Sequence, residues 1–164
     1  MPRENIRFSV VGDVQYSRAF EMLAHEANDI SEPLAEIGDQ IISSVHENFR
    51  TEGGHGVAGG WKQLNPAYAE WKRQQVGDEP ILVFSGKMRA AMIDPGSLQI
   101  SPRRLVYEPD APDYAIQHQD PTVDGHPPQR KMVSLNMDDR RQFDRVFVEW
   151  LNAMRSGPIA MAGA

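Results

Sequence analysis

The stretch SEPLAEIGDQIISSVHENFR, residues 31–50, gives the clearest structural signal in the chain. Its apolar residues recur at spacings of three and four, which is the pattern of an amphipathic helix. They are Leu34, Ile37, Ile41, Val45 and Phe49. Ser31 is a candidate N-cap and Pro33 suits the first turn. We therefore expect a long helix that ends near Arg50, with one face buried.

Shorter elements flank this helix. Alternation of apolar residues predicts a strand over 6–15, and a helix over 18–30 follows Ser17. Further along, we expect helices over 65–75 and 85–92, antiparallel strands around 98–100 and 105–107, and a short helix or turn over 113–119. A strand or its remnant over 131–135 and a last helix over 137–154 follow. Asn65, Ser85 and Asn136 are the expected caps. These elements predict one α+β domain over 1–155, with long helices packed on a small, mainly antiparallel sheet, and a flexible tail over 156–164.

A glycine-rich loop follows the long helix. Residues 51–60 contain five glycines and little apolar surface, so we expect this loop to be mobile. Trp61 comes directly after it, whereas Leu64 and Trp71 share a helical stripe with Tyr68 and are expected in the core. Large aromatic side chains beside mobile loops often anchor protein interfaces. Trp61 is therefore a candidate interface residue.

Composition limits the classes of function. The chain has 164 residues, 40% apolar and 24% charged, as expected for a globular domain. Its net charge of −6 argues against a general nucleic-acid binder, and the lack of cysteine excludes disulfides and thiolate chemistry. No apolar run predicts a signal peptide or a membrane span, so we expect folding in the cytoplasm and no membrane partner.

No motif predicts an enzyme or a cofactor site. His25-Glu26 and His46-Glu47 lack the second histidine that a zinc protease motif requires. The run GGHGVAGG, residues 53–60, follows a helix rather than a strand and lacks the Lys-Ser/Thr pair that follows the glycines of a phosphate-binding loop. Ser85 lacks the glycine two residues before it that a nucleophile elbow needs. We therefore expect no catalytic residue, no metal and no cofactor.

Three basic doublets remain for interactions with charged partners: Arg103-Arg104, Arg130-Lys131 and Arg140-Arg141. They could face DNA, pair with acidic groups on a partner subunit, or simply be solvated. The sequence leaves these alternatives open.

Five segments in order resemble a known family: PLAEIGDQIISSVHENFRTEGG, GGWKQLNPAYAEWK, ILVFSGKMRAAM, YAIQHQ and HPPQRKMVSLNMDDRRQFDRVFVEWL. Together they resemble the phage virion morphogenesis family, the Mu-like tail completion or head–tail connector group of tailed bacteriophages. The resemblance covers about residues 6–152. It rests on the joint order of the segments, because none of the motifs is specific alone.

The resemblance implies a structural virion protein rather than an enzyme. Such a protein completes the tail or neck at the head–tail junction as one subunit of a homo-oligomeric ring, six-fold by analogy, after assembly in the host cytoplasm. It implies contacts with other neck and tail proteins and with DNA that passes through the channel. We expect Trp61, Leu64 and Phe49 at the subunit interface.

Arg103, Arg104 and Arg130 are the expected residues of the channel wall or docking face. Two alternatives stay open: an assembly factor that is absent from the virion, and a small hydrolase using His118 and Asp120.

Overall fold

A computed structural model describes residues 25, 28–120 and 127–162, with only the backbone for residues 155–162. Over these residues the chain combines five α-helices, one 3-10 helix and a two-stranded antiparallel sheet. This agrees with the expected α+β class. The strand predicted over 6–15 and most of the helix predicted over 18–30 lie outside the described residues.

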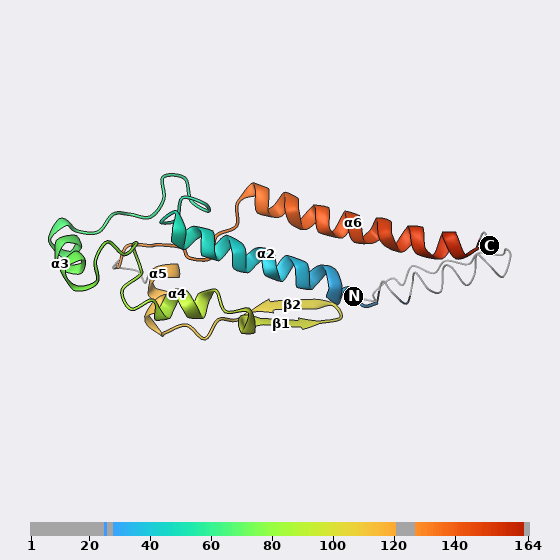
Figure 1. Cartoon of the computed structure of the whole chain (residues 1–164), viewed down its shortest axis with the longest axis horizontal. Coiled ribbons are helices and arrows are strands. Elements are labelled where there is room, and N and C mark those ends of the chain that lie inside the picture. Colours follow the sequence, from blue (N-terminus) through green and yellow to red (C-terminus); the bar gives the residue numbers. More distant parts are fainter. Residues whose placement is uncertain (1–24, 26–27, 121–126, 163–164) are drawn as a thin grey trace, which may run out of the picture.

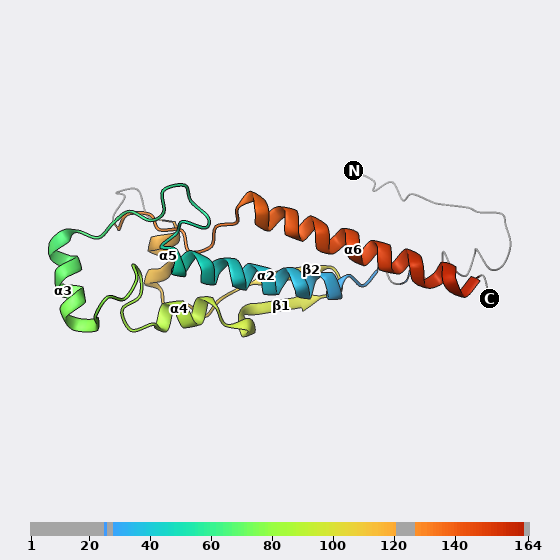
Figure 2. The ribbon, with the colours of Figure 1, turned by 45° about the horizontal axis from the view of Figure 1, so that its top comes forward.

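The elements form an elongated arrangement around one central helix. In chain order they are α2 (Ser31–Arg50), α3 (Pro66–Val76), α4 (Lys87–Met92), the 3-10 helix η1 (Pro95–Ser97), β1 (Leu98–Ser101), β2 (Arg104–Tyr107), α5 (Tyr114–Gln119) and α6 (Met137–Ala162). α2 contacts α6, α4 and both strands, and it runs beside α6 along the long axis (Figure 1). α3 and α5 lie at the end where α2 terminates (Figure 2).

The apolar stripe of α2 is buried as its spacing predicts. Ile37, Val45 and Phe49 are buried in the interior. The predicted cap is wrong, because Ser31 is the first helical residue and makes no side-chain cap bond. Instead, the Ser31 amide donates to Asp29 Oδ1 at 2.9 Å, so the carboxylate of Asp29 satisfies a free N–H group at the helix start.

The predicted hairpin forms and packs on α2. β1 and β2 pair antiparallel, with Leu98 opposite Tyr107 and Ile100 opposite Leu105. Gly38 of α2 permits the close approach, because a Cβ there would lie 2.9 Å from Leu98 Cδ1. Among the described elements, α2 makes the main helix contacts to both strands, and α6 packs on α2.

The segment 131–135 does not form the predicted strand, because side chains take the place of a neighbouring strand. Asn48 Nδ2 donates to the carbonyls of Met132 and Ser134, at 3.1 Å each. Gln119 Oε1 accepts from the amides of Met132 and Val133, and Gln119 Nε2 donates to the Val133 carbonyl. These bonds satisfy the backbone of a segment that bends at Met132 and Val133 and pairs with neither described strand.

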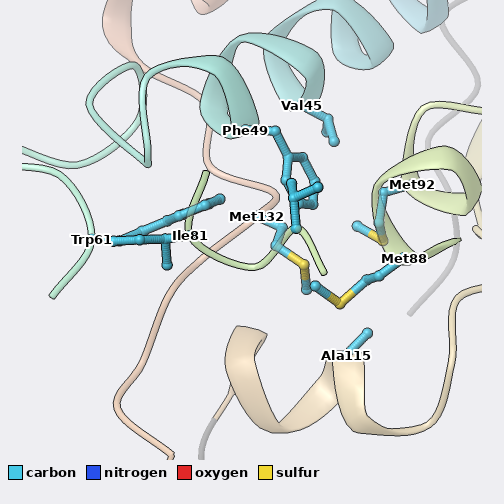
Figure 3. Packing of buried hydrophobic residues seen from close by; sticks show 9 residues of the cluster. Val45, Phe49, Trp61, Ile81, Met88, Met92, Ala115 and Met132 are labelled. Carbon is cyan, nitrogen blue, oxygen red and sulfur yellow. The ribbon is translucent and has the colours of Figure 1, made fainter. Parts of the chain in front are cut away.

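The main core lies between the last turn of α2, α4, α5 and segment 131–135. Figure 3 shows Phe49, Met88 and Met132 converging there, with Trp61 and Ile81 on one side. The flexible thioether side chains of the two methionines fit the irregular space between these short elements.

Two helix ends differ from the predictions. Gly86, in a left-handed conformation at φ 77°, precedes α4, and Ser85 does not cap it. α6 begins as predicted, since Asn136 Oδ1 accepts from the amides of Asp138 and Asp139 at 2.8 and 2.9 Å. Its backbone stays helical through Ala162, beyond the predicted end at Met154, so residues 156–162 of the expected tail are helical.

Candidate functional site

The glycine-rich loop over 51–60 folds against the chain instead of forming a free arm. The Gly53 amide donates to the Asn48 carbonyl at 2.7 Å, and the Trp61 amide donates to the Glu52 carbonyl at 2.6 Å. Gly53 has a φ of 84°, and a Cβ there would lie 2.3 Å from the Trp61 ring. The glycines therefore serve tight turns and close packing, and the expectation of a mobile arm is wrong.

A polar cluster fastens this loop to α2 and α6. The side chain of Asn48, 0% exposed, accepts from the Gly56 amide at 2.9 Å. Asp139 accepts from Ser44 Oγ at 2.5 Å and contacts His55 Nε2 at 3.0 Å. We call Ser44, Asn48, His55 and Asp139 the loop latch. Its members join α2 and the loop that follows it to α6, which is more than 80 positions away in the sequence.

The loop latch holds a serine, a histidine and an aspartate, but their order does not suit catalysis. In a nucleophilic triad the histidine lies between serine and aspartate and takes the serine proton. Here Asp139 is in the middle, bonded to both Ser44 and His55. Burial alone would raise the pKa of Asp139. Hydrogen bonds from Ser44, the Asn136 amide and His55 outweigh burial and hold that pKa below its ordinary value. The arrangement keeps Asp139 charged and acts as a structural tie.

Two of the three expected interface residues are buried inside the chain, and the third is half-buried. Trp61 is 3% exposed, meets Phe49 edge-on with ring centroids 5.6 Å apart, and donates from Nε1 to the Lys131 carbonyl at 2.9 Å. Phe49 is buried and Leu64 is half-buried against the same core. The prediction of Trp61 as an exposed anchor is therefore wrong, because its ring and its N–H group both have partners within the chain.

The expected basic site is divided between the two ends of the molecule. Arg103 lies in the hairpin turn and donates to Asn28 Oδ1, near the start of α2, and Arg104 is exposed beside it. Arg130 is 5% exposed, and its Nε donates to the Lys62 carbonyl at 2.9 Å. The 20 residues of α2 span about 30 Å between these ends. The three arginines therefore do not form one exposed patch within a single chain, because Arg130 is buried and lies at the opposite end from Arg103 and Arg104.

His118 and Asp120 do not form a catalytic pair. Among the described residues, the buried Nδ1 atom of His118 has no hydrogen-bond partner, and Asp120 is exposed. Burial, and secondarily the charge of Arg130, lower the pKa of His118, which favours the neutral imidazole. Within residues 28–120 and 127–162, no aspartate is hydrogen-bonded to this ring, so these residues do not supply the partner that a catalytic histidine would need.

An exposed aromatic patch occupies the end of the molecule at α3. Trp71 is 47% exposed and stacks on Phe84, with centroids 5.7 Å apart and planes inclined by 11°. Tyr68 packs beside Trp71 at 5.5 Å. We call Tyr68, Trp71 and Phe84 the aromatic patch. Contiguous apolar surface of this kind marks contact sites in soluble proteins.

A cavity of about 830 Å³ adjoins the aromatic patch, between α3, residues 82–86 and α5. Tyr68, Phe84 and Tyr114 contribute aromatic surface to its lining. We call it the α3–α5 cavity. Its lining also includes His118 and cationic side chains, described next.

Two buried cations line the α3–α5 cavity, Arg130 and Lys72, each 5% exposed. Lys72 Nζ donates to the carbonyls of Glu79 and Pro80, at 2.5 and 2.7 Å. Burial lowers the pKa of both cations. Among the described residues that line the cavity, none is an aspartate or glutamate.

The sequence reasoning missed Phe84 and Lys72 and placed Trp71 in the core. A usable signal was present in α3, PAYAEWKRQQV, where Tyr68 and Trp71 are the only aromatic residues and the rest is mostly alanine and polar. Two aromatic residues without a wider apolar stripe fit a surface patch better than a core face. No pattern in the sequence predicted that Lys72 would be buried.

In the described part of the chain, no three histidine, aspartate or glutamate side chains gather as a metal site would require. No helix among these residues is long and apolar enough for a membrane span. Comparison of the chain with protein-family models, curated proteins and solved structures finds no match.

Proposed function

We propose that this chain is a structural component of a tailed-bacteriophage particle, acting at the head–tail junction or tail end rather than as an enzyme. The observation that carries the proposal is the aromatic patch, because three large side chains, each almost half exposed, form continuous apolar surface at one end. Such surface favours a protein partner. The segments that resemble the virion morphogenesis family in their order along the chain point to another protein of the phage particle as that partner.

The proposed assembly is a closed ring of identical chains, six-fold by analogy with that family. A ring needs a head-to-tail contact between two different surfaces of each subunit. An elongated chain with apolar surface at one end suits such a contact (Figure 1). The subunit interface is therefore proposed at the aromatic patch, in place of Trp61, Leu64 and Phe49.

DNA contact is proposed only for the hairpin end. Arg103 and Arg104 are exposed in the hairpin, whereas Arg130 is buried. If subunits surround DNA, the wall facing it should be less negative than the outside, since phosphate repulsion otherwise opposes passage. The hairpin turn is the proposed part of that wall.

Mass spectrometry of purified particles from the phage that encodes this chain tests the proposal. We expect the chain in the particle at a low, ring-like copy number. Absence from particles, with presence in infected cells, would instead identify the non-virion assembly factor. Light scattering after size exclusion then reports whether the free chain forms rings. A monomer alone is not decisive, because such rings can form only on the tail.

A pair of matched variants tests the interface. Trp71→Ser should abolish incorporation into particles while leaving the fold intact, because Trp71 lies on the surface. Ile100→Ser, which removes another exposed apolar side chain from the hairpin end, is the control and should be incorporated normally. Equal incorporation of both variants would contradict an interface at the aromatic patch.

A further inference from the structure

The burial of Arg130 and Lys72 beside one cavity needs a physical explanation. A buried charge without an ionic partner is costly, and such charges are normally paired. Neither cation forms a salt bridge within residues 28–120 and 127–162, where the hydrogen-bond partners found are backbone carbonyls. The charges of Glu52 and Glu79 favour the charged form of Lys72, so Arg130 has the greater need for an anion, and a cavity beside it is suited to one.

Both cations keep hydrogen-bond donors for a ligand. A guanidinium carries five N–H groups and an ammonium three. Arg130 donates to the carbonyls of Lys62 and Gln63, and Lys72 to those of Glu79 and Pro80. Each group therefore has N–H groups left over. In the same lining, the buried Nδ1 atom of His118 has no hydrogen-bond partner among the described residues.

The rest of the lining favours an apolar ligand group. Tyr68, Phe84 and Tyr114 are all large exposed hydrophobics that border the cavity. The volume of about 830 Å³ lies within the range of roughly 300–1,000 Å³ in which compact ligands are enclosed. It can receive one or two side chains of a peptide together with their backbone.

We propose that the α3–α5 cavity binds a carboxylate-bearing peptide segment of a partner protein. An aromatic or aliphatic side chain of that segment lies between Tyr68, Phe84 and Tyr114. Its aspartate or glutamate carboxylate faces Arg130 and Lys72. Charge-assisted hydrogen bonds to the two cations give specificity, and the apolar contact buries most of the surface area of the interface.

A peptide fits better than a nucleic acid, although bases also stack on aromatic side chains. Single-stranded nucleic acid requires a groove of exposed cations that follows its backbone. Here Arg130 and Lys72 are recessed, and the chain carries a net charge of −6. That the partner belongs to the phage particle rests on the proposed function. The binding of an acidic segment does not depend on the proposed function.

The test compares three probes on the full chain carrying 13C-methyl methionine. Two peptides are matched, acetyl-Glu-Leu-Trp-Asp-amide and its Gln/Asn counterpart, and the third probe is a ten-residue thymidine oligonucleotide. The methyl group of Met88, which lines the cavity, reports binding at the site. Met137, exposed on α6, is the internal control. We expect the acidic peptide to shift Met88 alone and to bind at least about tenfold tighter than the amide peptide.

Variants separate the two parts of the site. Arg130→Gln should abolish the preference for the acidic peptide, whereas Tyr114→Ala should weaken both peptides equally. Lys62→Gln, at an exposed lining position, should reduce the preference, and Arg103→Gln at the other end should leave it unchanged. Because Arg130 also holds residues 62–63, circular dichroism checks its fold, and Lys62→Gln serves if Arg130→Gln does not fold.

Several results would overturn the inference. They are equal affinity of the two peptides, no shift of Met88, a preference that survives both charge variants, or tighter binding of the oligonucleotide. None of them bears on whether the chain is present in particles, so mass spectrometry tests the proposed function separately.

Discussion

Asn48→Ala tests the loop latch most directly. The Asn48 side chain makes three hydrogen bonds: to the carbonyls of Met132 and Ser134, 3.1 Å each, and from the Gly56 amide, 2.9 Å. Alanine would remove the donor to the carbonyls of Met132 and Ser134, and it would leave the Gly56 amide only its longer bond to the Gly53 carbonyl, at 3.3 Å. At about 1 kcal/mol per lost bond, plus part of the desolvation cost of stranded groups, we expect a loss of about 3–5 kcal/mol. That is a large share of the roughly 5–15 kcal/mol that stabilises a typical domain.

Urea unfolding followed by circular dichroism measures this loss by linear extrapolation. The matched control is Asn65→Ala, which removes an exposed cap that accepts from the Ala67 amide at 3.0 Å. The control should lose about 1 kcal/mol. If Asn48→Ala costs no more than Asn65→Ala, then Asn48 does not hold segment 131–135, and our account of the missing strand fails.

Asn48→Asp separates hydrogen-bond chemistry from shape, because the two side chains are isosteric. A carboxylate can still accept from Gly56, but it would face the carbonyl oxygens of Met132 and Ser134 without donors. The aspartate variant should therefore be at least as destabilised as alanine at pH 7. It should recover part of the loss near pH 3, where a protonated carboxyl group can donate once. An equal loss of stability relative to wild type at the two pH values would contradict this geometry.

Three further perturbations address the loop, the loop latch and the tryptophans. Gly56→Ala would place a Cβ 2.6 Å from the Ser134 carbonyl oxygen, so we expect a loss of about 1–3 kcal/mol in urea unfolding, whereas a free loop would tolerate alanine. The lowered pKa of Asp139 contributes stability that is complete above pH about 4 and is lost as pH falls through the folded-state value. Urea midpoints at pH 7 and pH 3 should therefore differ less in Asp139→Asn than in wild type, and an equal difference would contradict this role. Trp61→Ala should lose about 3–5 kcal/mol and Trp71→Ala less than about 1.5, as thermal unfolding would show; the reverse order would refute the assigned burial.

Local patterns predicted the elements that depend on local interactions. The spacing of apolar residues in α2 corresponds to the buried face of that helix, and Asn65-Pro66 begins α3 with the expected cap bond. Alternation around 98–107 predicted two antiparallel strands, and β1 and β2 pair in this way. Each of these signals reflects neighbours within four residues or across a tight turn, and the sequence carries that information directly.

The missed features depend on contacts between distant residues. The Trp61 N–H reaches the Lys131 carbonyl 70 positions away, and Asn48 binds segment 131–135 more than 80 positions away. Glycines next to a tryptophan fit both a free arm and a tight turn packed on the indole. Only the three-dimensional arrangement decides between them. Here it exchanges the expected positions of the two tryptophans, because Trp61 is buried and Trp71 is exposed.

This exchange changes how assembly defects should be interpreted. A Trp61 variant that fails to assemble would say little about an interface, because removal of its ring opens the core beside Phe49. Trp71 lacks this ambiguity, since almost half of its surface already meets solvent. A folded Trp71 variant that no longer assembles would thus locate a contact at the α3 end. The acidic-peptide preference of the adjoining cavity would then show whether that contact also uses charge.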